Sequence, residues 1–179
     1  VGFDDEHARV IAATGAASGG PIRVLNGYFV NGQAPESDKF AYKMKWLDGL
    51  QAYVRAELAR QPRLLLMGDF NIVPEDRDSY DPVGLAGTIH HTEAERAHFR
   101  ALLGLGLADS FRLFEQPPKS YSWWDYRMLG YPKNRGLRID HILVSDALRP
   151  QVSACSIDRV PRKWDKPSDH APVIVELSD

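Results

Sequence analysis

Apolar and polar residues follow two different periods along this chain. Across residues 38–60, apolar side chains recur at every third or fourth position, which predicts an amphipathic helix that Ser37 or Asp38 can cap. Thr92 and Glu95 have the spacing of a capping box, so we expect a second helix over about 92–103. Short runs of β-branched and other apolar residues predict strands, at 22–30, 63–67, 120–126, 137–145, 152–158 and 173–177.

Two stretches carry weaker signals. Residues 1–17 have little helix or strand character outside 8–13, and 108–114 is expected to be irregular or a short turn. Strands outnumber the clear helices, which indicates an α/β fold in which two sheets pack face to face with helices outside. At 179 residues, the chain is expected to form a single domain over 1–179.

The composition is that of an ordinary globular protein, with 44% apolar and 26% charged residues. No apolar run approaches the length of a membrane span, and the N-terminus lacks the pattern of a signal peptide. Cys155 is the only cysteine, which excludes an intrachain disulfide and makes a cysteine-based zinc site implausible. We therefore expect a soluble cytoplasmic protein.

Charge is distributed unevenly along the chain. Residues 119–166 hold ten Lys and Arg against five Asp, a local charge of +5, so the rest of a chain of net charge −2 carries −7. Aromatic residues interleave with these basic residues, at Tyr121, Trp123, Trp124, Tyr126, Tyr131 and Trp164. This combination indicates a phosphate-bearing partner, although a solvated basic face is the plainer alternative.

An apolar strand over 64–67 ends in Gly68-Asp69-Phe70-Asn71. Alternation along an extended backbone puts Asp69 and Asn71 on the same side, at the end of the strand where catalytic groups of open α/β sheets gather. A carboxylate and an amide there suit metal-assisted chemistry. Because Gly, Asp and Asn also favour turns, a plain turn remains the alternative.

Three other segments carry candidate chemistry. Tyr28, at the end of a predicted strand, offers a phenol to a phosphate oxygen, unless it is simply a core tyrosine. Asp140 lies on an otherwise apolar strand, where an unpaired carboxylate is costly. Asp169 and His170 lie between Pro167 and Pro172, and His170 could act as an acid, a base or an oxyanion donor that Asp140 orients, with a plain turn as the alternative. The remaining histidines are expected to be surface or packing residues, namely His7, His90, His91, His98 and His141.

Taken together, these segments resemble exodeoxyribonuclease III, of the endonuclease/exonuclease/phosphatase superfamily. The resemblance runs in order over nearly the whole chain from about Asp4. Gly-Asp-Phe-Asn at 68–71 and Ser-Asp-His at 168–170 are shared across the superfamily. Ser-Trp-Trp-Asp-Tyr-Arg at 122–127 and Asn-Arg-Gly-Leu-Arg-Ile-Asp at 134–140 are more specific to the exonuclease III branch.

The resemblance implies a four-layer α/β sandwich, in which two packed mixed β-sheets are flanked by helices. It also implies hydrolysis of DNA phosphodiesters that depends on Mg²⁺ or Mn²⁺. The expected activities are 3′-to-5′ exonuclease action on double-stranded DNA, incision beside abasic sites and removal of 3′ phosphates, all in base-excision repair. A membrane partner is not expected.

The resemblance also implies residue roles. Asp69 orients the attacking water or the leaving oxygen, and Asn71 holds the same water. His170, held by Asp140, bonds a non-bridging oxygen of the phosphate that Tyr28 also contacts. The implied metal ligands are Asp69, Asn71 and Asp169. The implied DNA contacts are Trp123, beside an extruded abasic sugar, and the phosphate donors Arg127, Arg135 and Arg138.

The N-terminal part of the sequence differs from the family's pattern. Members begin with a strand that carries an Asn, and a following strand ends in Gln-Glu, whose Glu is the main metal ligand; neither motif occurs here. We therefore expect an N-terminally truncated member with a weak metal site and little or no activity on its own. Exposed sheet edges and an uncovered apolar face predict dimerisation or partial disorder near the N-terminus.

Two other functions stay open at this level. One is a phosphomonoesterase or lipid phosphodiesterase of the same superfamily, such as an inositol polyphosphate phosphatase. The other is a DNA-binding remnant that cannot cleave. The basic and aromatic residues between 119 and 166 favour DNA over either small-molecule substrate.

Overall fold

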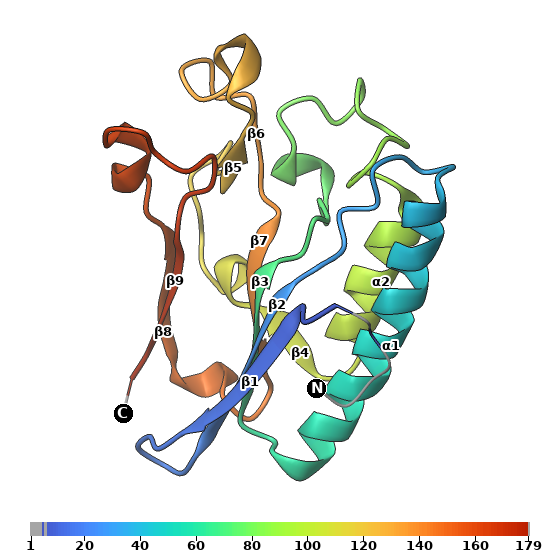
Figure 1. Cartoon of the computed structure of the whole chain (residues 1–179). Helices are drawn as coiled ribbons and strands as arrows, with labels where there is room; N and C mark the ends of the chain where they lie inside the picture. The colour runs from blue at the N-terminus through green and yellow to red at the C-terminus, as the bar shows by residue number, and fades with distance from the viewer. Residues whose placement is uncertain (1–4, 6, 179) are drawn as a thin grey trace.

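The computed structural model describes Asp5 and residues 7–178. Over these residues, a five-stranded mixed sheet lies between a layer of helices and a smaller second sheet (Figure 1). Its strand order is β1-β2-β3-β7-β4, and β2 and β3 are parallel while the other neighbours are antiparallel. The strands span Val10–Gly15 (β1), Ile22–Tyr28 (β2), Leu64–Asp69 (β3), Leu107–Asp109 (β4) and Asp140–Ser145 (β7).

Helices α1 (Asp38–Arg60) and α2 (Glu93–Leu103) cover one face of this sheet (Figure 1). The Ser37 side chain caps α1, and Thr92 and Glu95 form the capping box of α2, as predicted. The helices pack on alternate positions of the central strands, with Leu25, Leu66 and Leu143 fully buried in that core. None of the helices in the described part of the chain is both long and apolar enough to cross a membrane.

The opposite face of the large sheet packs against a hairpin of β8 (Val152–Ile157) and β9 (Val173–Leu177). Leu65, Ile142 and Val144 supply the large sheet's side of this second core. A third sheet pairs β5 (Trp123–Trp124) with β6 (Gly136–Leu137). The connections contain 3₁₀ turns, at Asp76–Asp78 (η1), Ser110–Leu113 (η2), Arg127–Leu129 (η3), Arg149–Gln151 (η4) and Val160–Lys163 (η5).

The predicted packing of two sheets with helices outside is confirmed for three layers of the described residues. Both helices lie where the sequence predicted them. Four details differ: β1 is a clear strand, β4 precedes the short turn η2 that was expected at 108–114, β5 covers only Trp123–Trp124 of the predicted strand 120–126, and the predicted strand 137–145 is broken at 138–139. β1 was not recognised because most of its side chains are exposed, so pairing with β2 rather than an apolar pattern defines it. The predicted N-terminal disorder concerns a segment, residues 1–4 and 6, outside the described residues.

Candidate active site

The register of three strands brings predicted site residues into one row. Tyr28 of β2 lies opposite Asp69 of β3, and Asp69 lies opposite Asp140 of β7. Side chains of laterally paired residues leave the same face of a sheet. The row therefore follows directly from β2-β3-β7 pairing, and it faces the layer of β8 and β9, away from the helices.

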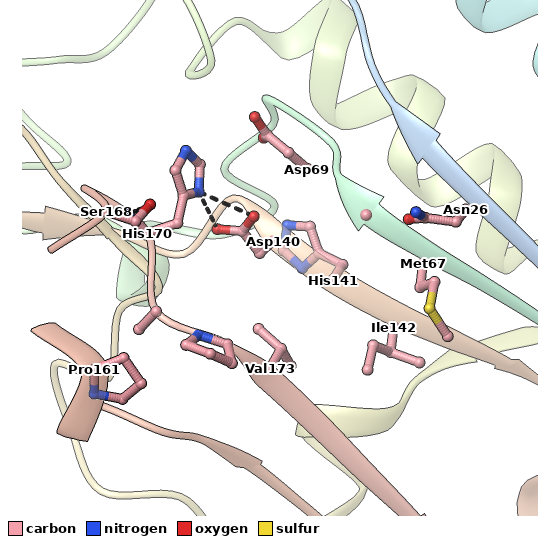
Figure 2. Close-up of a pocket in the computed structure, with 13 residues that line it drawn as sticks. Asn26, Met67, Asp69, Asp140, His141, Ile142, Pro161, Ser168, His170 and Val173 are labelled. Carbon is pink, nitrogen blue, oxygen red and sulfur yellow. Dashed lines mark hydrogen bonds and ion pairs between the residues drawn. The ribbon is translucent and has the colours of Figure 1, made fainter. Parts of the chain in front are cut away.

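A cavity of about 420 Å³ opens at this row, between the large sheet and the segment before β9. Its lining includes Asp69, Asp140 and His170, with Met67 and Ile142 deeper between the layers (Figure 2). Tyr28 lies beside a neighbouring hollow that shares Asp69, and its side chain is 57% exposed. Carboxylate, imidazole and phenol groups thus meet at one accessible place.

His170 is held against Asp140 by its Nδ1 atom, 2.9 Å from Oδ2 and 3.1 Å from Oδ1 (Figure 2). Two backbone contacts with the strand of Trp123 hold the segment that carries His170. Ala171 N donates to Ser122 O at 2.7 Å, and Trp123 and His170 form an antiparallel β-bridge. Burial alone lowers the pKa of His170, but the hydrogen bond and charge of Asp140, with the charges of Asp69 and Asp169, raise it above its ordinary value. The pair therefore favours a positively charged imidazole at the cavity.

The surroundings of Asp69 disfavour the charged form of its carboxylate. Burial, and then the charge of Asp140, raise the pKa of Asp69 to about 6, although His170 and a hydrogen bond from Asn71 oppose the rise. The strand end that presents it requires glycine at Gly68, whose φ is +136° and whose added Cβ would lie 1.9 Å from Gly27 O. A cation at the cavity would relieve the repulsion between Asp69 and Asp140.

Asn71 holds the carboxylate of Asp69 by two hydrogen bonds. Its backbone N–H donates to Asp69 Oδ1 at 2.9 Å, and its Nδ2 donates to Asp69 Oδ2 and Phe29 O at 3.1 Å. The side-chain oxygen of Asn71 accepts from Asn31 Nδ2, also at 3.1 Å, and the residue is 3% exposed. The geometry gives Asn71 a positioning role under Asp69, and its role as a metal ligand stays a prediction.

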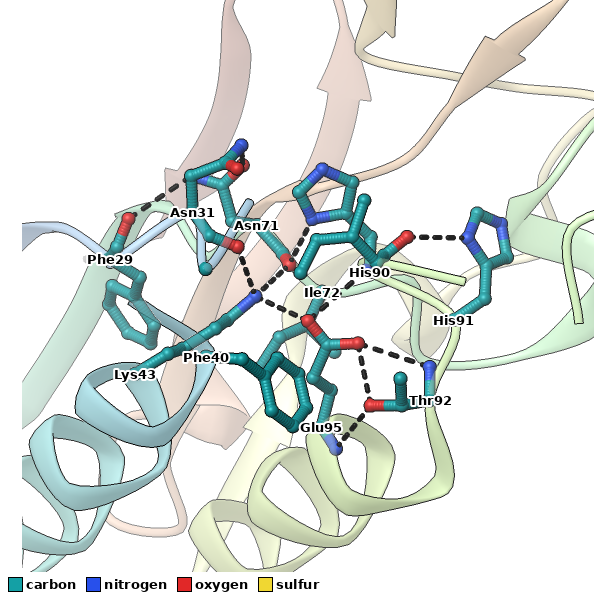
Figure 3. Close-up of polar contacts among 12 residues, drawn as sticks. Phe29, Asn31, Phe40, Lys43, Asn71, Ile72, His90, His91, Thr92 and Glu95 are labelled. Atoms are coloured by element: carbon teal, nitrogen blue, oxygen red, sulfur yellow. Dashed lines mark hydrogen bonds and ion pairs between the residues drawn. The ribbon is translucent and has the colours of Figure 1, made fainter. Parts of the chain in front are cut away.

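A buried ion pair that the sequence analysis missed lies beneath this loop (Figure 3). Lys43 Nζ donates to Asn71 O at 2.7 Å, to Asn31 O at 3.1 Å and to Glu95 Oε1 at 2.5 Å. All three ammonium hydrogens are thus engaged, and both side chains of the ion pair are fully buried. A signal was present, because Lys43 falls on the apolar stripe of α1, where a charged residue needs a partner.

His90, expected to be a surface or packing residue, also joins this network. Its Nδ1 lies 2.7 Å from Asn71 O, and its backbone N–H donates to Glu95 Oε1 at 3.1 Å. His141, which was placed in the same group, is buried between Phe70 and Phe99 on the helix side of the sheet. Both are packing residues around the site.

A second cavity, of about 650 Å³, adjoins the site and gathers three of the predicted DNA contacts. Trp123, Arg127 and Arg135 line it together with His90. Trp123 Nε1 donates to Asp169 Oδ2 at 3.0 Å, which directs that carboxylate toward the indole. Arg127 is strongly exposed and paired with Asp125, with Nη2 2.6 Å from Oδ2.

Arg138 requires a correction. It is 1% exposed, and its guanidinium bonds Asp78 Oδ1 at 2.6 Å and Asp109 Oδ2 at 2.7 Å. A residue held in this way inside the protein has no access to DNA, so the prediction that it contacts a phosphate is wrong. Arg138 instead ties η1 and β4 to the segment that leads into β7.

The implied divalent cation fits the chemistry of part of this site. Asp69 supplies a hard oxygen ligand at a place with surplus negative charge. The side chains of Asn71 and Asp169 are engaged with Asn31 and Trp123, respectively. Among residues 5 and 7–178, no three His, Cys, Asp or Glu side chains are grouped so that they could hold a metal ion. Asp69 is thus the predicted ligand that faces the cavity.

Comparisons with known proteins agree with this geometry. The model of the endonuclease/exonuclease/phosphatase family matches residues 2–170. Exodeoxyribonuclease III of Haemophilus influenzae is 37% identical over 97% of this chain and 68% of its own length.

Solved structures give the same assignment. A structure described as the 3′ phosphatase NExo from Neisseria bound to a product DNA hairpin is 45% identical, with a TM-score of 0.92, over 98% of this chain and 66% of that one. An AP endonuclease from Archaeoglobus fulgidus is 31% identical, with a TM-score of 0.88, over 98% of this chain and 68% of that one. The chain thus spans about two thirds of the length of these relatives. It belongs to the endonuclease/exonuclease/phosphatase family and is a homologue of exodeoxyribonuclease III.

Proposed function

We propose that this site hydrolyses phosphate esters of double-stranded DNA with the help of Mg²⁺ or Mn²⁺, in base-excision repair. The expected reactions are 3′-to-5′ exonuclease cleavage, removal of 3′ phosphates and incision at abasic sites. The observation that carries this proposal is the meeting of Asp69 with the His170–Asp140 pair in one cavity between the sheets. The described functions of the Neisseria and Archaeoglobus relatives support it.

Each residue has a task that its environment suits. The charged His170 donates to a non-bridging phosphate oxygen, because Asp140 keeps its pKa raised. Asp69, whose carboxylate is held by the backbone N–H and Nδ2 of Asn71, orients the attacking water or the leaving oxygen. Tyr28 directs its exposed phenol to the same phosphate. Asp69 would also hold the cation, which, when bound, neutralises phosphate charge and lowers the pKa of water.

The neighbouring cavity is the proposed place for the nucleotide next to the scissile phosphate. Trp123 offers an aromatic face there, and Arg127 and Arg135 offer guanidinium groups to the DNA backbone. These contacts would not depend on sequence, because they address phosphates and ring faces rather than base edges.

We further propose that the chain alone turns over slowly. Of the three predicted metal ligands, Asp69 alone lines the cavity, so the cation would keep most of its water. In the four-layer sandwich implied by the resemblance, a helical layer would cover the outer face of β8 and β9. Within the described residues, that face carries the exposed Ile174.

The test compares a DNA hairpin that carries a 3′ phosphate, a recessed 3′ end and an abasic duplex, each with Mg²⁺, with Mn²⁺ and with a chelator. We expect metal-dependent hydrolysis that Asp69→Asn abolishes and His170→Gln reduces. His98→Gln, a change on α2 away from the cavity, serves as the matched control. Preferential hydrolysis of inositol phosphates would instead favour the phosphomonoesterase or lipid phosphodiesterase, and DNA bound without cleavage would favour the non-catalytic remnant.

A further inference from the structure

A cluster of two arginines and three aromatic rings lies beside the candidate active site. Arg159 places its Cζ 5.0 Å from the ring centroids of both Trp124 and Tyr131. Arg162 places its Cζ 4.8 Å from Tyr131 and 5.6 Å from Tyr126. The rings come from the β5 and η3 region, Arg162 comes from η5 and Arg159 directly precedes it, so the cluster joins two separate segments of the chain.

This cluster lacks an anion within the described part of the chain. Neither Arg159 nor Arg162 has a carboxylate within 4.0 Å there, and Arg162 is only 6% exposed. Its Nε and Nη1 atoms are buried and have no hydrogen-bond partner among the described residues. Arg138 differs, because its guanidinium, in a residue that is 1% exposed, bonds two aspartates. Buried charges are ordinarily paired, so the arginine cluster is short of a negative partner.

The cluster also borders the cavity of the site. Pro161, between the two arginines in sequence, lines the same cavity as His170 (Figure 2). Tyr126 donates its hydroxyl to Pro167 O at 2.7 Å, which ties the cluster to the segment that presents His170. An anion bound at the arginines would therefore be close to a phosphate in the cavity.

The same segment exposes groups that suit a nucleic acid strand. Lys163 and Lys166 are exposed, and Trp164 is 64% exposed. The nearby Asp158 uses its carboxylate within the loop, accepting from Val160 N at 2.9 Å. An accessible indole among cations matches the surfaces that hold DNA strands by phosphate contacts and base stacking.

We propose that Arg159, Arg162 and Trp164 form a second DNA-binding surface, which holds the strand as it leaves the cavity. The exposed Arg159 binds a backbone phosphate, whose charge also compensates the buried Arg162 on the same aromatic rings, and Trp164 stacks on an unpaired base. Arg guanidinium groups already stacked on aromatic rings are preorganised for such phosphate contacts. This inference rests on the proposed function, because it requires the substrate to be DNA.

The test measures binding, so it does not depend on turnover. A labelled duplex with a single-stranded extension is titrated with the chain in a chelator, at several salt concentrations. We expect Arg159→Ala to weaken binding roughly tenfold and to reduce the salt slope by about 1. Trp164→Ala should weaken binding to the extension with an unchanged salt slope. Arg149→Ala, which removes an exposed arginine in η4 at the other end of β8, should leave binding unchanged.

Arg162→Lys separates a binding role from a structural one. It keeps the charge but loses the planar guanidinium, so weaker DNA binding at an unchanged melting temperature supports the proposal. If Arg159→Ala and Trp164→Ala bind DNA as the unaltered chain does, the surface is not a DNA site. A chain that shows these binding losses but hydrolyses no DNA ester would overturn the proposed function and leave this surface standing. If the chain cleaves DNA and these substitutions do not alter its DNA binding, the second surface is ruled out and the proposed function stands.

Discussion

At the scale of single residues, Asp69 and His170 both have raised pKa values, but for different reasons. Burial and the neighbouring Asp140 make the anionic form of Asp69 costly, whereas the same Asp140 makes the cationic form of His170 favourable. One carboxylate thus adjusts both groups. Asp140 therefore favours the protonated form of both side chains at the cavity.

The role of Asp140 can be tested through His170. With Asp140→Asn, the hydrogen bond and charge that raise the pKa of His170 against its burial are lost, so this pKa should fall. Because the folded pKa of His170 is raised in the unaltered chain, its contribution to stability is complete below about pH 6.5 and disappears as pH rises through the folded value. The variant should therefore lose stability mainly at acidic pH. NMR titration of the His170 ring and melting at pH 5 and 9 measure both effects. An unchanged His170 titration would contradict the assignment.

Asp69 should lower the stability of the fold. Its pKa rises from 3.8 when unfolded to about 6 when folded, so stability is lost as pH increases between those values. Asp69→Asn should therefore stabilise the metal-free chain above pH 6, by about 1–3 kcal/mol, while abolishing hydrolysis. Urea unfolding at pH 7.5 and pH 4 measures the change, and the gain should disappear at the lower pH. A destabilised variant at pH 7.5 would show that the folded chain does not disfavour the charged form of Asp69.

At the scale of elements, α1 and α2 act together as a clamp on the site. Lys43 of α1 and Glu95 of α2 form a buried pair that also holds the carbonyls of Asn31 and Asn71. These carbonyls follow β2 and β3, the strands that supply Tyr28 and Asp69. Helix packing and catalytic geometry are therefore coupled through one ammonium group.

Removal of that ammonium should be costly. Lys43→Met leaves Glu95 charged and buried, so we expect a loss of about 3–5 kcal/mol of stability and a lower kcat. The double variant Lys43→Met/Glu95→Gln should recover most of the stability but not kcat, because the carbonyls of Asn31 and Asn71 still lack their donor. Glu57→Gln is the matched control: its pairing with Arg23 joins the opposite end of α1 to β2, and Arg23 is 23% exposed. That change should cost about 1 kcal/mol or less and spare kcat. Full recovery of kcat in the double variant would reduce Lys43 to a structural role.

The helices and the main site residues could be predicted from the sequence, whereas the burial of Arg138 could not, and each result has a physical reason. The limits of α1 and α2 follow from side-chain period and caps, which are local. Asp69, Asp140 and His170 follow from motifs at strand ends. Arg138 was misassigned because its partners Asp78 and Asp109 are brought to it by the fold, and a basic residue in a basic stretch gives no local sign of burial. Lys43 did give such a sign, by its position on an apolar stripe.

At the scale of the whole molecule, the large sheet has different surroundings at its two faces and its edges. Helices cover one face and the β8–β9 hairpin packs on the other. Among the described strands, β1 is an edge, and it exposes most of its length, including Ile11 at 68%. An exposed, uncharged edge of this kind can accept a strand from a second chain.

Dimerisation should therefore occur through β1 and depend on concentration. Light scattering coupled to size exclusion, over a wide range of protein concentration, should show a monomer converting to a dimer. Ile11→Lys places a charge on the edge and should shift the chain to the monomer. Val83→Lys adds the same charge at a loop side chain that is 87% exposed, and it should leave the equilibrium unchanged. A monomer at every concentration would rule out the edge as an interface. A dimer that survives Ile11→Lys would point instead to the outer face of β8 and β9, where Ile174 is 43% exposed and Ile174→Lys is the corresponding change.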